Sequence, residues 1–427
     1  MRRNLLRTVL AASSVLAISL TGCSSGSSGS DDTTLVFRQF DPAAQIQGLE
    51  KAVDAWNNSH PDIQVELQTL SPNDVQQFAR EANSGTGPDI TQLGLADVAF
   101  VADPDILLPL DKYLKSDPSI DADNLLAMDM VKSDGKTWAM PWTVDTMALV
   151  YNPKALASAG IDAPPTSWEE LADNAAKISS SSGGEVAGFC WPAGGAATSS
   201  GWYAINYYIW SHGGTLIEKS SSGKWQPGVS RSQLEDAIKY LNGLFVSGAT
   251  PTSYQAVSDY SDAAILNELA TGDCAMSYQP PATFRTVQSQ ADAQGIELVT
   301  APMPDGTTDG STHLGGRALG INRNTEHPDA AWEFIKYLMS SDTFESYDQY
   351  PASTSTLSKL DVPEAEKGYV KQLPHAESFA RYIGSETNVG TIQEIVNGQF
   401  SAVYSGQKDA QSAASAILKQ LRAALKG

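Results

Sequence analysis

The sequence contains few cysteines, few histidines and no familiar catalytic motif. Three cysteines and five histidines occur in 427 residues, and the histidines are scattered without the spacing of metal ligands. Phosphate-binding loops, GxGxxG, HExxH and CxxC motifs are missing from the sequence. Acidic residues are plentiful, but no pair of them stands out as the acid and base of a glycosidase. The sequence therefore predicts a protein that is not an enzyme and that holds no metal or cofactor.

Positive charge is also scarce. The chain has 28 lysines and arginines against 49 aspartates and glutamates, so its formal charge is −21. Nucleic acid is excluded as a partner because its phosphates need a basic surface. An acidic surface also discourages adsorption onto anionic lipid headgroups.

The chain has one notable apolar run, which lies near its amino terminus. Three arginines, Arg2, Arg3 and Arg7, precede an apolar stretch over residues 8–20. A helix of about 13 residues reaches only about 20 Å, which is shorter than the hydrocarbon core of a bilayer. Residues 1–22 are therefore predicted to be a signal peptide.

The residues that follow resemble the cleavage site of a lipoprotein. Residues 20–23 read Leu-Thr-Gly-Cys, and the resemblance implies cleavage before Cys23 and diacylglycerol on its thiol; an ordinary signal peptide is the alternative. Residues 23–33 are mostly serine, glycine and aspartate, so we expect a flexible tether there. Cys190 and Cys274 could form a disulfide outside the cytoplasm or stay as buried thiols, and the sequence does not decide between them.

Hydrophobic periodicity after the tether predicts an α/β fold. Residues 35–37, 63–67 and 89–93 read as strands, and apolar residues at helical spacing lie between them, at 46, 49, 53 and 56 and again from 75 to 82. This order favours an open and largely parallel sheet covered by helices. Further on, residues 147–151 read as a strand, Ser167 and Ser230 start capping boxes, and Pro328 opens a helix. Roughly 395 residues are too many for one hydrophobic core, so two α/β lobes are expected.

Several segments resemble, in order, the extracellular carbohydrate-binding proteins of ABC importers, the family that includes maltose-binding proteins. The segments are residues 83–90 (NSGTGPDI), 107–114, 134–145, 149–153, 165–171, 272–276 and 315–321. The resemblance implies two lobes that close over a solute held between them. It also implies that the chain crosses between the lobes near Asp145, Met303 and Ser340. Residues 34–145 and 303–340 would then form the first lobe, and residues 146–302 and 341–427 the second.

The resemblance also places candidate binding residues. Asp145 stands where relatives carry a carboxylate that accepts hydrogen bonds from sugar hydroxyls, although a turn-capping role is the alternative. Flat rings are needed to pack on the C–H face of a pyranose. Candidates for these rings are Trp142, Trp191, Trp210 and Tyr278. Any one of them could instead belong to the hydrophobic core, and Tyr203, Tyr207 and Trp210 would share one helical face.

Backbone and arginine contacts complete the predicted site. Gly315, Gly316 and Arg317 occupy a turn in which missing side chains would let a solute approach backbone N–H groups, or which is merely tight. Arg381 matches a family arginine that binds hydroxyls, but Tyr382 replaces the proline that usually follows. Gln39 follows the first strand, where many relatives carry tryptophan.

The sequence as a whole therefore predicts the solute-binding lipoprotein of a sugar importer. It would be a monomer, anchored by lipid to the outer face of the cell membrane, and it would deliver a mono- or oligosaccharide to permease subunits. A lipid-anchored binding protein for another solute and a surface glycosidase are the alternatives.

Overall fold

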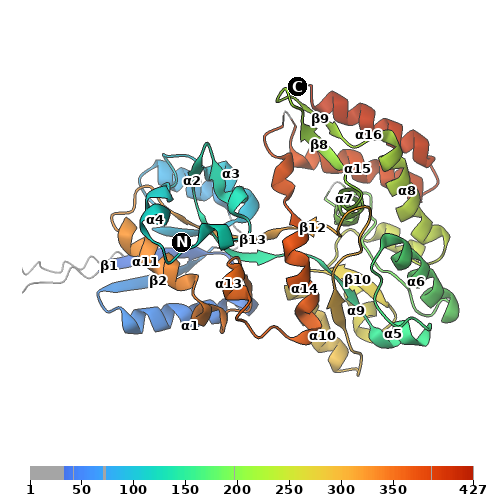
Figure 1. Ribbon diagram of the computed structural model, residues 1–427, viewed down its shortest axis with the longest axis horizontal. Coiled ribbons are helices and arrows are strands. Elements are labelled where there is room, and N and C mark those ends of the chain that lie inside the picture. The colour runs from blue at the N-terminus through green and yellow to red at the C-terminus, as the bar shows by residue number, and fades with distance from the viewer. Residues whose placement is uncertain (1–32, 42, 71–73, 197, 386, 427) are drawn as a thin grey trace, which may run out of the picture.

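The computed structural model describes residues 33–426 except 42, 71–73, 197 and 386. The predicted signal peptide, Cys23 and nearly all of the predicted tether lie outside the described residues. Thr33, which the sequence placed in the tether, is the first residue of β1 and pairs with Ile63. Figure 1 shows two lobes side by side, each with a sheet and surrounding helices.

A six-stranded sheet forms the centre of the first lobe, in the order β14-β6-β13-β3-β1-β2. Its strands are β1 (Thr33–Gln39), β2 (Ile63–Thr69), β3 (Ile90–Gly94), β6 (Met140–Asp145), β13 (Gly315–Ile321) and β14 (Tyr350–Pro351). β1 is parallel to β2 and β3, as the sequence predicted, but β13 is antiparallel to β3 and β6. The sheet is mixed because β13 and β14 both run antiparallel to β6.

Helices cover this sheet, and the periodicity predicted the principal ones. They are α1 (Ala43–Ser59), α2 (Val75–Asn83), α3 (Val98–Val101), α4 (Asp111–Ser116), α11 (Pro328–Leu338), α12 (Ser341–Phe344) and α13 (Thr354–Leu357). Leu49, Val53 and Trp56 of α1 are buried. The ring of Trp56 meets that of Phe334 from α11 edge-on, with centroids 5.3 Å apart. The apolar faces of helices from distant parts of the sequence thus share one core.

The second lobe is built on a smaller antiparallel sheet in the order β10-β7-β11. Its strands are β7 (Ala148–Tyr151), β10 (Met276–Gln279) and β11 (Val299–Ala301), and its helices are α5 (Pro153–Ser158), α6 (Trp168–Ser181), α7 (Gly201–Ser211), α8 (Arg231–Val246), α9 (Ala263–Thr271), α10 (Pro281–Asp292), α14 (Lys367–Gln372), α15 (Val389–Tyr404) and α16 (Ala410–Ala424). Short pairs complete the fold: β4 (Lys132–Ser133) with β5 (Lys136–Thr137), β8 (Thr215–Lys219) with β9 (Trp225–Gly228), and β12 (Thr312–His313) with β15 (Ala376–Glu377).

The two predicted capping boxes differ in the structure. Ser230 and Gln233 form both reciprocal bonds at the start of α8. At α6 the Ser167 hydroxyl accepts from the Glu170 N–H, but the Glu170 carboxylate accepts from the Thr166 N–H at 2.7 Å. The capping box at Ser230 is therefore confirmed. At Ser167 the Glu170 carboxylate binds the N–H of Thr166 instead of that of the cap residue.

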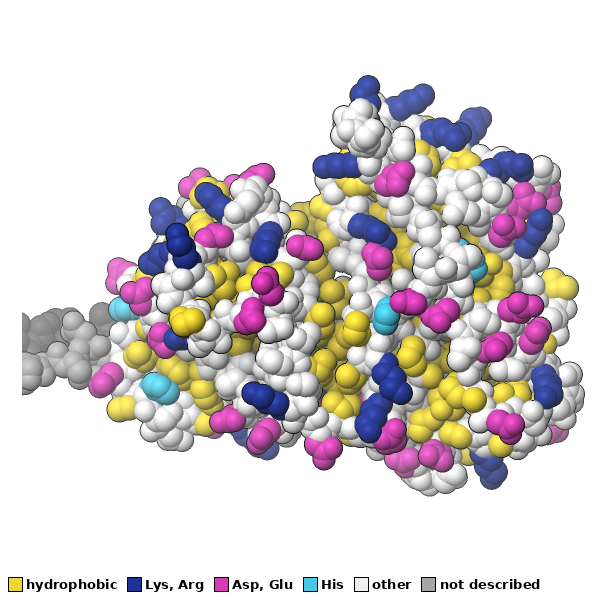
Figure 2. All heavy atoms as spheres, in the orientation of Figure 1, with side chains coloured by type: hydrophobic (Ala, Val, Ile, Leu, Met, Phe, Trp, Pro, Cys, Tyr) yellow, Lys and Arg dark blue, Asp and Glu magenta, His cyan; other side chains and the backbone are white. Residues whose placement is uncertain are grey.

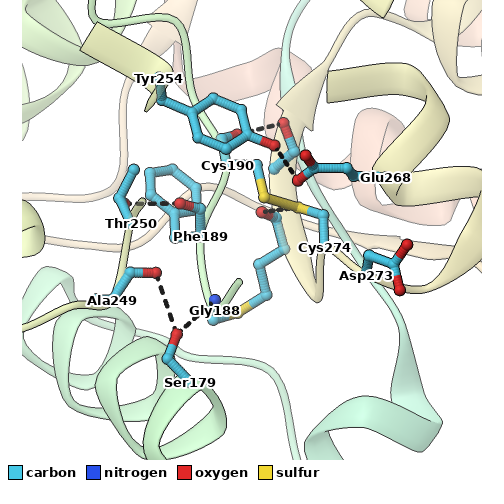
Figure 3. Close-up of a disulfide and its surroundings, with 12 residues drawn as sticks. Ser179, Gly188, Phe189, Cys190, Ala249, Thr250, Tyr254, Glu268, Asp273 and Cys274 are labelled. Atoms are coloured by element: carbon cyan, nitrogen blue, oxygen red, sulfur yellow. Dashed lines mark hydrogen bonds between the residues drawn. A yellow bond between two sulfur atoms is a disulfide. The ribbon is translucent and has the colours of Figure 1, made fainter. Parts of the chain in front are cut away.

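A disulfide joins Cys190 to Cys274, which settles the choice that the sequence left open (Figure 3). Cys190 precedes Trp191 in a buried segment, and Cys274 lies just before β10. Nearby, the Thr250 hydroxyl donates to the Phe189 carbonyl at 2.6 Å. The bond therefore attaches the segment around residue 190 to the edge of the second sheet.

The chain passes between the sheets more than once. β6 ends in the first sheet at Asp145 and β7 begins in the second at Ala148. The chain returns through β12 to β13. β14, beyond residue 340, still pairs with β6. The lobe limits at residues 303 and 340 stay a prediction. Within the described part of the chain, no helix is both long enough and apolar enough to cross a membrane.

Candidate functional site

Two strands that pass between the lobes meet at Asp145 and Gly315. Asp145 is half-buried and is the last residue of β6, and its backbone pairs with that of Gly315 at the start of β13. A Cβ atom on Gly315 would lie 2.2 Å from Oδ1 of Asp145. Glycine therefore makes the room in which this carboxylate sits. Next to it, the Thr146 hydroxyl donates to the His313 carbonyl at 2.8 Å, so the two crossing segments are hydrogen-bonded.

Gly316 is needed for the strand pairing itself. Its φ of +131° is one that residues with a side chain rarely adopt, and a Cβ would lie 2.1 Å from the carbonyl oxygen of Thr143. This glycine is buried and lets β13 approach β6 closely. These observations agree with the tight-turn alternative for Gly316 and do not test a solute contact.

Four partly exposed rings lie beside Asp145, and we call Tyr203, Tyr260, His313 and Phe379 the ring cluster. The Tyr203 ring stacks on that of His313 with centroids 4.8 Å apart, and it lies 5.7 Å from Phe379 and 6.1 Å from Tyr260. Phe379 belongs to the 3₁₀ helix η7 (Phe379–Tyr382). The cluster thus brings together α7, the loop before α9, β12 and η7.

Burial and the negative charges of two carboxylates shift the pKa values of the titratable rings. Burial first, and then the negative charges of Asp259 and Asp145, raise the pKa of the Tyr203 phenol. Burial, Tyr203 and both carboxylates raise the pKa of Tyr260. Burial lowers the pKa of His313, and Asp145 opposes this shift. The rings are therefore uncharged near neutral pH, and both carboxylates lie close to them.

The first lobe contributes Arg317, Phe40 and Asp41. Arg317 lies on the same face of β13 as Gly315, because alternate residues of a strand share a face. Its guanidinium carbon lies 4.6 Å from the centroid of the Phe40 ring. Its Nε lies 3.4 Å from Asp41 Oδ1, an ion pair whose geometry is too poor for a hydrogen bond. Arg317 is partly exposed, and a carboxylate of its own lobe holds its guanidinium.

Trp210 and Arg381 meet beside a separate cavity of the second lobe. The guanidinium carbon of Arg381 lies 5.6 Å from the centroid of the Trp210 ring, and its Nη1 lies 2.9 Å from the Glu377 carboxylate. The Trp210 indole N–H donates to the Tyr382 hydroxyl at 3.0 Å. The cavity has a volume of 540 Å³. Phe379 connects it to the ring cluster, since its ring centroid lies 4.9 Å from that of Trp210.

The structure places Trp142, Trp191 and Tyr278 in the hydrophobic core instead of at the surface between the lobes. The Trp142 indole N–H donates to the Leu338 carbonyl at 2.9 Å, and Trp191 has no exposed surface. The Tyr278 hydroxyl donates to the Ser200 carbonyl at 3.1 Å. Their burial agrees with the core alternative that the sequence left open for such rings.

Gln39 is also enclosed. Its Nε2 donates to the Thr69 hydroxyl at 2.7 Å, and its Oε1 accepts from the Asp41 N–H at 2.5 Å. Its side chain therefore orients the Asp41 loop and has no exposed surface for a solute.

Sequence reasoning missed Tyr260, His313, Phe379, Phe40 and Asp259 as members of this site. Tyr203 stood in a segment rich in aromatic residues, which was a usable signal. The others are isolated in sequence and come together only through the crossings. No group of three or more His, Cys, Asp or Glu residues in the described part of the chain could hold a metal ion.

Figure 2 shows a furrow between the two lobes with hydrophobic side chains along it. The crossing strands β6 and β13 run between the lobes at this position in Figure 1. Asp145 and Arg317 belong to these strands, and Tyr203 and His313 of the ring cluster lie within the electrostatic reach of Asp145. Acceptor groups, flat rings and an arginine are thus gathered where the two lobes meet.

Curated proteins that resemble this chain include solute-binding proteins that match most of its length. A binding protein of Brucella abortus is 24% identical over 429 residues, which covers 96% of this chain and 98% of that protein. The sn-glycerol-3-phosphate-binding periplasmic protein of Yersinia pseudotuberculosis is 22% identical over 399 residues, covering 87% of this chain and 88% of that protein.

The fold is that of a solved bacterial receptor. The GacH receptor of Streptomyces glaucescens, solved unliganded and with acarbose, superposes with a TM-score of 0.70 at 24% identity, over 92% of this chain and 99% of that one. This similarity identifies the two-lobe fold of periplasmic binding proteins. The model of the bacterial extracellular solute-binding protein family matches residues 42–343. The chain belongs to the bacterial extracellular solute-binding protein family.

Proposed function

We propose that this chain is the substrate-binding subunit of an ABC-type sugar importer. It captures a mono- or oligosaccharide by closure of the lobes and delivers it to permease subunits. The observation that supports this most is the ring cluster beside the half-buried Asp145 at the crossing strands. The ring faces suit the C–H face of a pyranose, and the carboxylate suits two adjacent hydroxyls. Closure excludes water and strengthens these hydrogen bonds.

A phosphorylated solute such as glycerol phosphate is less well suited to this site. Phosphate is recognised by free basic groups or by bidentate arginine. Arg317 and Arg381 each already lie beside a carboxylate, Asp41 and Glu377 respectively. Two further carboxylates, Asp145 and Asp259, would repel the phosphate.

Calorimetric titration of the purified mature chain against a carbohydrate panel tests the proposal. We expect heat of binding and a raised melting temperature with at least one saccharide, because a ligand that binds only the folded state stabilises it. Tyr203→Ala should weaken this binding at least tenfold, whereas Tyr240→Ala, whose ring packs against Trp168 away from the crossings, should not. Absence of binding to every saccharide would contradict the proposal. Release of shorter sugars from a labelled oligosaccharide would identify a glycosidase instead.

We also propose that the mature protein is a monomer anchored to the outer face of the cell membrane through lipid on Cys23. Mass spectrometry of the mature amino terminus should detect a diacylglyceryl group on this cysteine. Cys23→Ser should release the protein from the membrane fraction, because the lipid on this cysteine is the attachment that we propose. A cleaved but unmodified amino terminus would instead indicate an ordinary signal peptide.

A further inference from the structure

We propose that the site between the lobes selects a saccharide that carries a protonated amine over its neutral counterpart. This inference rests on the proposed function and narrows its substrate class. It comes from a mismatch at the site: hydrogen-bond acceptors, negative charges and ring faces are present, while the cations are already paired.

The two carboxylates at the ring cluster lack a cation. Among the described residues, no hydrogen bond or ion pair reaches the carboxylate of Asp145. Asp259 accepts from the Ser261 N–H at 2.8 Å and from the hydroxyls of Ser261 and Ser200, all of which are neutral donors. Both carboxylates act electrostatically on the phenols of Tyr203 and Tyr260. Their negative charges therefore add at one place without compensation.

Arg317 and Arg381 already pair with other carboxylates. On the first lobe, Arg317 lies 3.4 Å from a buried carboxylate, that of Asp41. On the second lobe, Arg381 pairs with Glu377 at 2.9 Å. The aromatic neighbour His313 is neutral near pH 7, since burial lowers its pKa. Each arginine pair sums to zero charge, so Asp145 and Asp259 leave the site negative.

A buried acceptor beside the cluster also lacks a donor. The amide nitrogen of Gln279 donates to the Tyr260 carbonyl at 3.0 Å. Its Oε1 has no hydrogen-bond partner in the described part of the chain, although the residue has no exposed surface. A buried acceptor without a partner is costly in free energy. Gln279 has no exposed surface, so this acceptor is out of reach of a solute, and the amine preference rests on Asp145 and Asp259.

An ammonium group suits the two carboxylates and the ring faces beside them. It donates three hydrogen bonds and accepts none, and it is attracted to carboxylates and to the faces of aromatic rings. A neutral hydroxyl makes weaker bonds to a carboxylate than a charged donor does. Closure of the lobes lowers the local dielectric constant, which increases the difference between the two. The rest of the saccharide still packs on Tyr203 and Phe379, as in the proposed function.

Matched pairs of sugars test the preference in calorimetric titrations of the mature chain. Glucosamine, galactosamine and the β-1,4 glucosamine trimer are each compared with glucose, galactose and cellotriose, at a pH at which the amines are protonated. We expect at least one amine-bearing sugar to bind at least tenfold more tightly than its neutral counterpart. The difference should shrink as salt is added, because ions screen the partly exposed charges.

Asparagine variants locate the preference. Asp145→Asn should remove most of the tenfold difference, and Asp259→Asn part of it. Asp54→Asn on α1 is the control, since it changes the net charge equally at an exposed position. Circular dichroism melting verifies that each variant folds. If Asp145→Asn disrupts folding, two other measurements test the preference. They are the loss of the affinity difference between amine-bearing and neutral sugars in Asp259→Asn, and the salt dependence of that difference in the unmodified chain.

The outcomes separate this inference from the proposed function. Neutral sugars that bind as tightly as their amine counterparts would overturn the preference and leave the sugar-binding proposal intact. Binding of spermidine with no binding of any saccharide would overturn both. An amine preference that survives Asp145→Asn and Asp259→Asn would also overturn the inference, because its physical cause would be absent.

Discussion

At the residue scale, two adjacent glycines have different roles, and this can be tested. Gly315→Ala places a Cβ against the Asp145 carboxylate, and Gly316→Ala places one against the Thr143 backbone at a strained φ. Because a carboxylate can rotate and a backbone carbonyl in a sheet cannot, we expect Gly315→Ala to weaken ligand binding with little change in stability. Gly316→Ala should lower the free energy of unfolding by about 1–3 kcal/mol. Titration and urea unfolding of both variants separate the two effects, and equal unfolding curves would contradict the assignment.

The lowered pKa of His313 predicts that the stability of the protein depends on pH. Burial lowers its pKa from 6.5, so the folded protein binds fewer protons than the unfolded chain around and below that value. Stability is then complete above the unfolded pKa and falls as the pH decreases through it. His313→Gln should make the free energy of unfolding less dependent on pH between about 7 and 5. His375→Gln, at an exposed position, is the control; an unchanged slope in His313→Gln would show that other groups cause the acid sensitivity.

The candidate residues show where sequence reasoning succeeds and where it stops. Asp145 and Arg317 lie at the crossing strands, where the family motifs placed them. Trp142 lies inside one of the motifs and Tyr278 two residues after another, but both side chains are buried in the core. The sequence position predicts which strand a residue belongs to. Which side chains of a short strand are buried depends on the elements that pack against it. Phe379 and Tyr260 had no local signal, since their roles arise only from packing around Tyr203.

At the element scale, regular periodicity predicted the helices that pack on sheets. The starts of α8 and α11 follow from Ser230 and Pro328, because caps and prolines act locally. The local sequence pattern could not predict that the first sheet contains both parallel and antiparallel strands. β13 pairs with β3 and β6 across hundreds of residues, and a strand pattern does not contain its direction.

A buried ionic cluster joins the elements near the last crossing. Arg285 of α10 contacts the Glu366 carboxylate with two nitrogens, at 2.8 and 2.6 Å. Glu366 ends the 3₁₀ helix η5 (Glu364–Glu366), and the Tyr350 hydroxyl of β14 also donates to it. Arg285 further donates to the Asp348 carbonyl at 2.6 Å. One arginine of the second lobe therefore holds a loop and a strand of the first.

Removal of this arginine should be costly. Arg285→Leu leaves the buried Glu366 carboxylate without its cation, and breaking a buried pair in this way costs about 3–5 kcal/mol. The exposed pair of Lys367 with Glu364 provides the control, since solvent screens it and Lys367→Ala should lower the stability far less. Chemical denaturation measures both. Similar losses in the two variants would mean that the cluster contributes no more than a surface pair.

At the scale of the whole molecule, the two-lobe fold was predicted from family motifs and chain length together. The family match spans residues 42–343, so it leaves out the last part of the chain. That part supplies Phe379 and Arg381 to the second lobe. Of the site residues that the sequence missed, Phe379 lies in this part of the chain, whereas Tyr260, His313 and Asp259 lie within the matched segment.

The strands that connect the lobes suit the closure that we propose. β6 and β13 pass between them side by side, and hydrogen bonds of Thr146 to the segment before Gly315 hold these crossings together. Each lobe has its own sheet, so we expect the lobes to move as rigid bodies about the crossings. A ligand shifts a population from mostly open to mostly closed only if it binds the closed form far more tightly, by about 10⁴-fold for a shift from 1:99 to 99:1. We therefore expect small-angle scattering to give a smaller radius of gyration when a saccharide that binds in calorimetry is present at saturation. A sugar that does not bind is the control, and an unchanged curve at saturation would mean that binding occurs without closure.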